Sequence, residues 1–137
     1  MMRKLNISAE TENLDKVIDF INENLKEFGC PLKTQIQIDI AAEEIFVNIA
    51  RYAYCPGKGL ATVCFEYISS ENAAAIIFID SGTPFDPLSN PDPDVTLSAE
   101  ERKVGGLGIY IVKKSMDDAY YVYRNGQNVL FIKKYLF

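Results

Sequence analysis

The spacing of hydrophobic residues along the chain predicts which segments are helices. A short segment over 4–9 fits an opening strand, and from 14 to 28 apolar residues recur every three or four positions, as in an amphipathic helix. Gly29 and Pro31 end this helix. The segment 33–54 alternates like a strand at its start, but its alanines, its glutamate pair and the spacing of its isoleucines are helical, and no turn residue divides it. We therefore predict one helix from about 33 to 54.

The remaining hydrophobic segments predict four strands and one further helix. The strands are expected at 60–68, 73–80, 119–124 and 128–137, and the helix at 108–116. The connection over 86–104 is rich in Pro, Asp and Ser, and its length favours a functional lid with one short helical turn near 98–102. This order predicts an α/β (α+β) fold for a single domain over 1–137. We expect a two-layer α/β sandwich, with helices on one face of a mixed, mostly antiparallel sheet.

Composition and charge favour a cytoplasmic protein that binds neither nucleic acid nor membrane. The net charge of −5 argues against a general nucleic-acid binder. No apolar stretch is long enough to span a bilayer, and the amino-terminal segment has no apolar signal core. The three cysteines, Cys30, Cys55 and Cys64, show no paired spacing, which favours reduced thiols.

The chain contains no histidine, and this absence excludes several kinds of chemistry. Ser-His-Asp and Cys-His nucleophile systems, histidine metal sites and phosphohistidine chemistry all require that side chain. Any acid–base step must therefore use Asp, Glu, Lys, Tyr or Cys.

The first candidate site is formed by Glu44 and Asn48 on the second predicted helix. Residues four apart lie on the same helix face, and this face also carries the apolar residues Ile40 and Ala41. One interpretation is that both polar side chains point to solvent at the edge of the face. The other is that the Asn48 oxygen binds Mg²⁺, which takes the rest of its ligands from water and phosphates. Glu44 would then orient and deprotonate an attacking hydroxyl or water.

The second candidate is Asp80 and Gly82, at the end of the strand over 73–80. An ordinary turn explains this pair on its own. The functional alternative is that Asp80 accepts a hydrogen bond from the exocyclic amine of adenine, while Gly82 lets the base approach the backbone. Such a bond to a charged acceptor is worth about 1.5–3 kcal/mol, which is enough to favour adenine over guanine.

The third candidate is the glycine cluster 105–108, which opens the third predicted helix. Unpaired N–H groups at a helix amino terminus bind phosphate, and Arg102 and Lys103 just upstream add positive charge. The cluster is neither a dinucleotide-binding fingerprint nor a Walker A loop, because the required glycine and lysine spacings are missing. A merely flexible loop remains the alternative.

Taken in this order, the three segments resemble the Bergerat-fold (GHKL-type) ATPases, over nearly the whole chain. The stretches AAEEIFVNIARYAY, DSGTPFDP and GGLGIYIVKKSMDDAYY are similar to the bacterial anti-sigma-factor serine/threonine-protein kinases. This resemblance implies a histidine-kinase-like ATPase domain with the Bergerat ATP-binding fold. It also implies ATP and Mg²⁺ as cofactors.

The resemblance assigns a role to each candidate residue. It implies that Glu44 is the general base and that Asn48 is the Mg²⁺ ligand. The nucleotide-binding residues that it implies are Asn48, Arg51, Asp80, Gly82, Pro84, Phe85, Arg102, Lys103, Gly105, Gly106, Leu107 and Gly108. It further implies an anti-sigma factor that binds a sigma factor and phosphorylates a serine of an anti-anti-sigma (STAS-type) partner. Members often form homodimers through the first helix and strand.

Two residues depart from the family pattern. Tyr52 stands where many members carry His, and the closing strand is expected to place Leu130 where members commonly carry a Thr near the nucleotide. Both departures leave the base and the metal ligand in place. They keep open a second hypothesis, a non-catalytic ATP-gated protein-binding regulator, and a third, a structural domain without a nucleotide site.

Overall fold

The computed structural model describes residues 2–89 and 106–137. The helices are α1 (Leu14–Glu27), α2 (Leu32–Asn48) and α3 (Gly106–Ser115), and the strands are β1 (Arg3–Ser8), β2 (Leu60–Ile68), β3 (Ala73–Asp80), β4 (Asp118–Arg124) and β5 (Gln127–Tyr135). Every predicted helix and strand is present, with shifts of a few residues at the ends. The predicted helical turn near 98–102 lies outside the described residues. No helix in the described part of the chain is long and apolar enough to cross a membrane.

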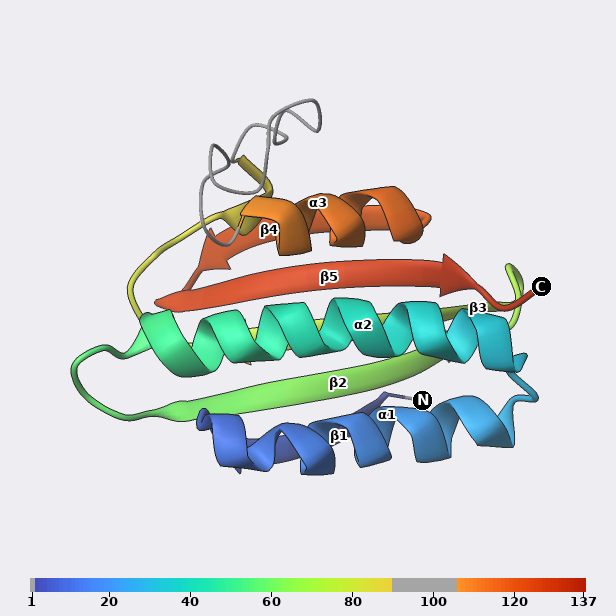
Figure 1. Ribbon diagram of the computed structural model, residues 1–137, viewed down its shortest axis with the longest axis horizontal. Coiled ribbons are helices and arrows are strands. Elements are labelled where there is room, and N and C mark those ends of the chain that lie inside the picture. The colour runs from blue at the N-terminus through green and yellow to red at the C-terminus, as the bar shows by residue number, and fades with distance from the viewer. Residues whose placement is uncertain (1, 90–105) are drawn as a thin grey trace.

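In the described part of the chain, five strands form one sheet in the order β1-β2-β3-β5-β4. All four strand pairings are antiparallel. Figure 1 shows α1, α2 and α3 on the same face of this sheet, with α2 crossing its middle and α3 lying over the β4–β5 side. The two-layer arrangement and the fold class are as the sequence predicts, but the described sheet is antiparallel throughout and not mixed.

The hydrophobic core lies between the helices and one face of the sheet. Alternate residues of the central strands point toward the helices, including Val63, Phe65, Ile76, Phe78 and Ile132, and all are buried. The helices contribute buried faces at helical spacing, made of Val17, Ile21 and Leu25 on α1 and of Ile38, Ala41, Ala42, Ile45 and Phe46 on α2. Because α2 packs over the strands, its carboxyl-terminal end lies near the end of β3.

A two-residue turn closes the last hairpin, and the pairing of β5 with β3 sets the neighbour of Asp80. Asn125 and Gly126 both have positive φ, at 55° and 76°, as a tight hairpin between β4 and β5 requires. The register of β5 against β3 pairs Asp80 with Asn128. The Asp80 carboxylate and the Asn128 amide therefore lie side by side, at the end of β3 and the start of β5.

The end of α2 differs from the single helix predicted over 33–54. After Asn48 the backbone continues as a π-helical turn over Ile49–Ala53. π-Helical turns are rare and frequently occur at functional sites. This turn changes the direction of the residues after Asn48, among them Arg51 and Tyr52, relative to a continuous α-helix.

A half-buried polar pair lies between α1 and α2. The Asn22 Nδ2 donates to Asp39 Oδ2 at 3.1 Å. The Oδ1 atoms of both residues are buried without a hydrogen-bond partner. Burial raises the pKa of Asp39, although hydrogen bonds from Asn22 and Gln35 oppose the shift. A neutral side chain at position 39 would therefore fit this interface better than a carboxylate.

We expect Asp39→Asn to stabilise the protein at neutral pH by about 0.5–1.5 kcal/mol, because the new amide can donate to the buried Asn22 Oδ1. When folding raises the pKa of an acid, its protonated form stabilises the folded protein. This stabilisation is complete below the unfolded-state pKa of about 3.9, and it is lost as the pH rises through the folded-state pKa. The gain should therefore shrink as the pH is lowered from 7 toward that value. Thermal unfolding across this range, with the exposed Asp19→Asn as the control, measures it. An equal or larger gain at acidic pH would contradict the explanation.

Candidate functional site

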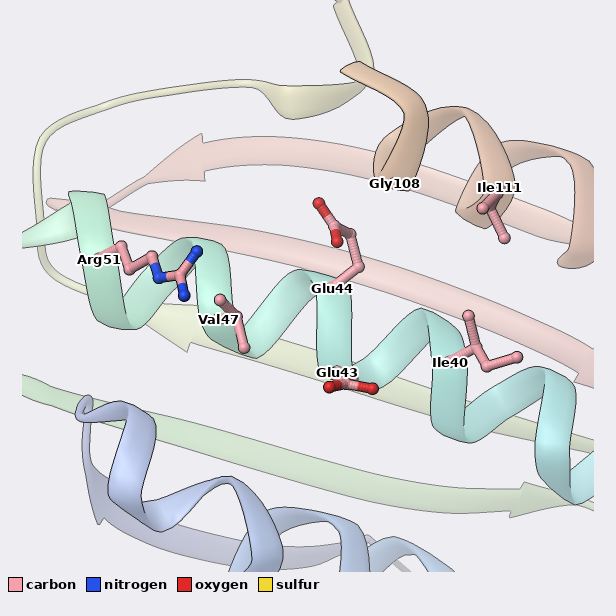
Figure 2. Close-up of a pocket in the computed structure, with 7 residues that line it drawn as sticks. All are labelled: Ile40, Glu43, Glu44, Val47, Arg51, Gly108 and Ile111. Carbon is pink, nitrogen blue, oxygen red and sulfur yellow. The ribbon is translucent and has the colours of Figure 1, made fainter. Parts of the chain in front are cut away.

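A cleft of ≈ 320 Å³ runs between α2 and α3. Figure 2 shows Glu44 pointing from α2 toward the first turn of α3, with Arg51 at one end of the cleft and Ile40 and Ile111 at the other. The residues that line it are Ile40, Glu43, Glu44, Val47, Arg51, Gly108 and Ile111. Two carboxylates and one guanidinium therefore share a cleft with the apolar side chains of Ile40, Val47 and Ile111.

Glu44 and Asn48 lie one turn apart and contact each other. The Asn48 Nδ2 donates to Glu44 Oε1 at 3.4 Å, and both side chains are half-buried. This hydrogen bond leaves the Asn48 Oδ1 as the oxygen that can bind a cation. Within the described residues, no group of three His, Cys, Asp or Glu side chains could hold a metal ion. A cation here would accordingly take most of its ligands from water and phosphate, which is the usual way that Mg²⁺ is held.

Gly108 brings α3 into direct contact with the Glu44 carboxylate. A Cβ atom at position 108 would lie 2.0 Å from the Glu44 carboxyl carbon. Any larger residue would thus displace this carboxylate. The contact places Glu44 against the first turn of α3, where unpaired N–H groups and the helix dipole favour anions.

The Asp80 side chain is only 6% exposed and is held by two protein donors. Its Oδ1 accepts from the Gly82 N–H and from the Asn128 Nδ2, each at 2.9 Å. Asn128 is also buried. A buried carboxylate is costly unless hydrogen bonds satisfy it, so these donors account for the presence of an acid at this position.

The segment after Asp80 is attached to the π-helical turn that follows α2. The Thr83 N–H donates to the Ala53 carbonyl at 2.9 Å. The Tyr54 hydroxyl accepts from the Ser81 N–H at 2.7 Å and donates to the Leu60 carbonyl at 2.6 Å. These bonds bring the end of the Asn48 helix and the Asp80 segment together, as one site would require.

Gly82 and Gly108 should respond differently to substitution by Ala. A Cβ at position 82 would lie 2.2 Å from the Ala53 carbonyl oxygen, which is rigid backbone, whereas a Cβ at position 108 meets the far end of a flexible side chain. We expect Gly82→Ala to lower the free energy of unfolding by about 1–3 kcal/mol, as overpacking does. Gly108→Ala should leave stability unchanged or raise it, because Ala favours the helix by about 1 kcal/mol. Chemical denaturation of the two variants tests the contrast, and equal losses would contradict it.

The other predicted site residues are placed as follows. Gly106 begins α3, and the Phe85 side chain is 55% exposed. Pro84 follows the attached Thr83, and Asp86 caps the turn over Pro87–Ser89 by accepting from the Leu88 N–H at 2.9 Å. The residues Arg102, Lys103 and Gly105, most of the expected lid and the side chain of Leu107 lie outside the described part of the chain.

The structure does not place all the candidate residues in one cavity. Asp80 and Gly82 do not line the α2–α3 cleft, and Gly82 lies against Ala53 of the π-helical turn at the end of α2. Tyr52 on that turn is 65% exposed. The site therefore has two parts, an acidic cleft at Glu44 and a buried acid at Asp80, joined through the residues that follow Asn48.

The expectation for Leu130 was wrong in its register. Leu130 pairs with Phe78 and belongs to the hydrophobic core, while the residue beside Asp80 is Asn128. Asn128 could not be identified from the sequence, because its contact with Asp80 arises from the pairing of β5 with β3, and these strands lie far apart in the sequence. The Asn-Gly turn at 125–126 gave the register of β5 against β4 only.

Known proteins are similar to this chain in sequence and in fold. A family model described as the histidine kinase-like ATPase domain matches residues 7–134. A serine-protein kinase RsbW from Listeria monocytogenes serovar 1/2a is 29% identical over 100 residues, which are 70% of this chain and 63% of that protein. A serine-protein kinase RsbW from Bacillus cereus is 32% identical over 98 residues, or 69% of this chain and 60% of that protein. The chain thus matches less than two thirds of the length of these relatives.

Two solved structures share the fold. The RsbU and RsbW domains of Rv1364c from Mycobacterium tuberculosis match 99% of this chain and 32% of that chain, with a TM-score of 0.70 and 15% identity. The histidine kinase domain of a blue-light activated histidine kinase from Erythrobacter litoralis matches 92% of this chain and 60% of that chain, with a TM-score of 0.55 and 14% identity. At these identities the likeness concerns the fold alone.

Proposed function

Because the chain belongs to the histidine kinase-like ATPase domain family, we propose that it binds ATP with Mg²⁺ and transfers the γ-phosphate to a serine of a partner protein. Curated relatives at about 30% identity are named serine-protein kinases. The observation that carries the proposal is Glu44, which lies one turn from Asn48 and against the first turn of α3. This arrangement supports a role for Glu44 as a base beside the proposed sites for cation and phosphate.

Each part of the site has a proposed task in binding the nucleotide. Asp80 accepts a hydrogen bond from the adenine amine, and the Gly82 N–H holds the Asp80 Oδ1. The close approach that Gly82 permits is that of the Ala53 backbone, where the sequence had suggested room for the base. The segment 105–108 and Arg51 hold the phosphates at the amino terminus of α3, where Arg102 and Lys103 add charge. Asn48 supplies its Oδ1 to Mg²⁺, which neutralises negative charge on the phosphates when it is bound.

In the proposed reaction, Glu44 accepts the proton of the attacking serine hydroxyl. The serine oxygen forms a bond to the γ-phosphorus while the bond from that phosphorus to the β–γ bridging oxygen breaks, so that ADP leaves. General-base catalysis of this type typically contributes about 10²–10⁴-fold in rate.

The family relatives also suggest the biological role. We propose that the single domain over 1–137 acts in the cytoplasm as an anti-sigma regulatory factor, alone or as a homodimer. Its partners would be a sigma factor and a STAS-type anti-anti-sigma protein that carries the acceptor serine. An alternative is a non-catalytic ATP-gated regulator, which the exposed Tyr52 beside the site favours because many members carry His there.

Calorimetric titration with ATP and Mg²⁺, followed by a transfer assay, tests the proposal. We expect saturable binding of ATP, and transfer of labelled γ-phosphate to serine in at least one member of a panel of STAS-type proteins. Binding without transfer to any of them would favour the ATP-gated alternative. The absence of ATP binding would overturn both and leave a structural domain.

A further inference from the structure

We propose that Asn128 is a positioning residue that orients the Asp80 carboxylate and thereby sets the preference for adenine. The inference rests on the proposed nucleotide site and adds to it a residue on β5. Asn128 is 7% exposed and pairs with Asp80 across the β3–β5 register. It lies between the buried acid on one side and β4 on the other.

The Asn128 amide has partners for both of its ends. Its Nδ2 donates to Asp80 Oδ1 at 2.9 Å and to the Thr83 carbonyl at 3.0 Å, with a longer contact to the Gly82 carbonyl at 3.4 Å. Its Oδ1 accepts from the Phe85 N–H at 3.1 Å and from the Tyr121 hydroxyl. One side chain thus connects the acid, the segment that follows it and β4.

These partners allow only one orientation of the amide. With the amide reversed, its oxygen would face the Asp80 carboxylate and two carbonyls, and its nitrogen would face the Phe85 N–H. Burial raises the pKa of Tyr121, and the Asp86 and Asp80 carboxylates raise it further, although a hydrogen bond with the Phe85 backbone opposes the shift. The phenol therefore remains a donor to the Asn128 oxygen.

The orientation of Asn128 decides which oxygen of Asp80 is available to a base. Within the described residues, both hydrogen bonds to this carboxylate end on Oδ1. The Oδ2 atom is left to accept the exocyclic amine of adenine. Without the Asn128 donor, the carboxylate would lose one of the two bonds that fix its rotation, and its preference for an amine in a single position would weaken.

The decisive measurement is the ratio of dissociation constants for inosine triphosphate and ATP. Inosine carries a carbonyl oxygen where adenine carries the amine, so we expect the wild type to prefer ATP by roughly 10–100-fold. Asn128→Ala should bring this ratio below about threefold. Tyr121→Phe removes one partner of the amide and should lower the ratio less. Gln127→Ala, on the exposed neighbour in β5, is the matched control and should keep the wild-type ratio.

A structural readout on the protein without nucleotide accompanies the titrations. Amide hydrogen exchange at Phe85 and Gly82 should accelerate at least tenfold in Asn128→Ala. The Phe85 N–H loses its acceptor, and the Gly82 N–H donates to an Asp80 carboxylate that is no longer held in one orientation. A variant that binds both nucleotides more weakly at the wild-type ratio would overturn the inference and leave the proposed function intact. A wild type that binds ATP and inosine triphosphate equally would also overturn it. A wild type that binds neither would overturn the proposed function itself.

Discussion

Glu44→Gln is expected to slow phosphate transfer to the partner serine by about 10²–10⁴-fold while ATP still binds. The amide cannot accept the serine proton, but it has nearly the volume of the carboxylate and fits the same space beside Gly108. Its oxygen can still accept from the Asn48 Nδ2. Removal of a negative charge beside the phosphates should leave the affinity for ATP unchanged or slightly higher. Single-turnover transfer at saturating ATP measures the rate, and calorimetry measures the affinity.

The neighbouring residue Glu43 supplies a matched control. It lines the same cleft, is exposed, and points away from the first turn of α3, as Figure 2 shows. Glu43→Gln removes the same charge from the same helix and should change the transfer rate less than about threefold. If the two substitutions slowed phosphate transfer equally, the loss of rate would come from the loss of negative charge in the cleft, and Glu44 would not be the base.

The elements of this fold could be predicted from sequence because they depend on local periodicity. The helix over 14–28 buries one stripe, which its hydrophobic spacing shows directly. The strands over 60–68 and 73–80 are continuous apolar segments that are buried over much of their length. The π-helical turn over Ile49–Ala53 could not be predicted in this way. It is accompanied by hydrogen bonds to Tyr54 and Ala53 from the N–H groups of Ser81 and Thr83, which are distant in sequence.

The candidate site shows the same division between local and distant information. Glu44 and Asn48 share a helix face, so their proximity follows from a spacing of four residues. The contact of Glu44 with Gly108 depends on how α3 packs against α2, and the contact of Asp80 with Asn128 depends on the register of β5. A pattern of motifs indicated the order of the site residues, but only the packed structure identifies Asn128 as the neighbour of Asp80.

Asp80→Asn should reduce the affinity for ATP by roughly 100-fold or more and remove the calorimetric signal at ordinary protein concentrations. The Gly82 N–H and the Asn128 Nδ2 both donate to the position of Oδ1, so the oxygen of the new amide must take that position. Its nitrogen then takes the position of Oδ2. There it would face the exocyclic amine of adenine with a donor against a donor, in addition to the loss of a charge-assisted hydrogen bond.

The same geometry predicts that Asp80→Asn reverses the choice of base. The carbonyl of inosine can accept from the amide nitrogen of the variant, so inosine triphosphate should now bind more tightly than ATP. Asp86→Asn is the control, since this acid caps the adjacent turn and should leave the preference for ATP unchanged. A general loss of folding would weaken the binding of both nucleotides together, and it would lower the thermal stability of the variant without nucleotide. If both affinities fell in parallel in a variant that remains folded, Asp80 would not contact the base, and the adenine site would have to lie elsewhere.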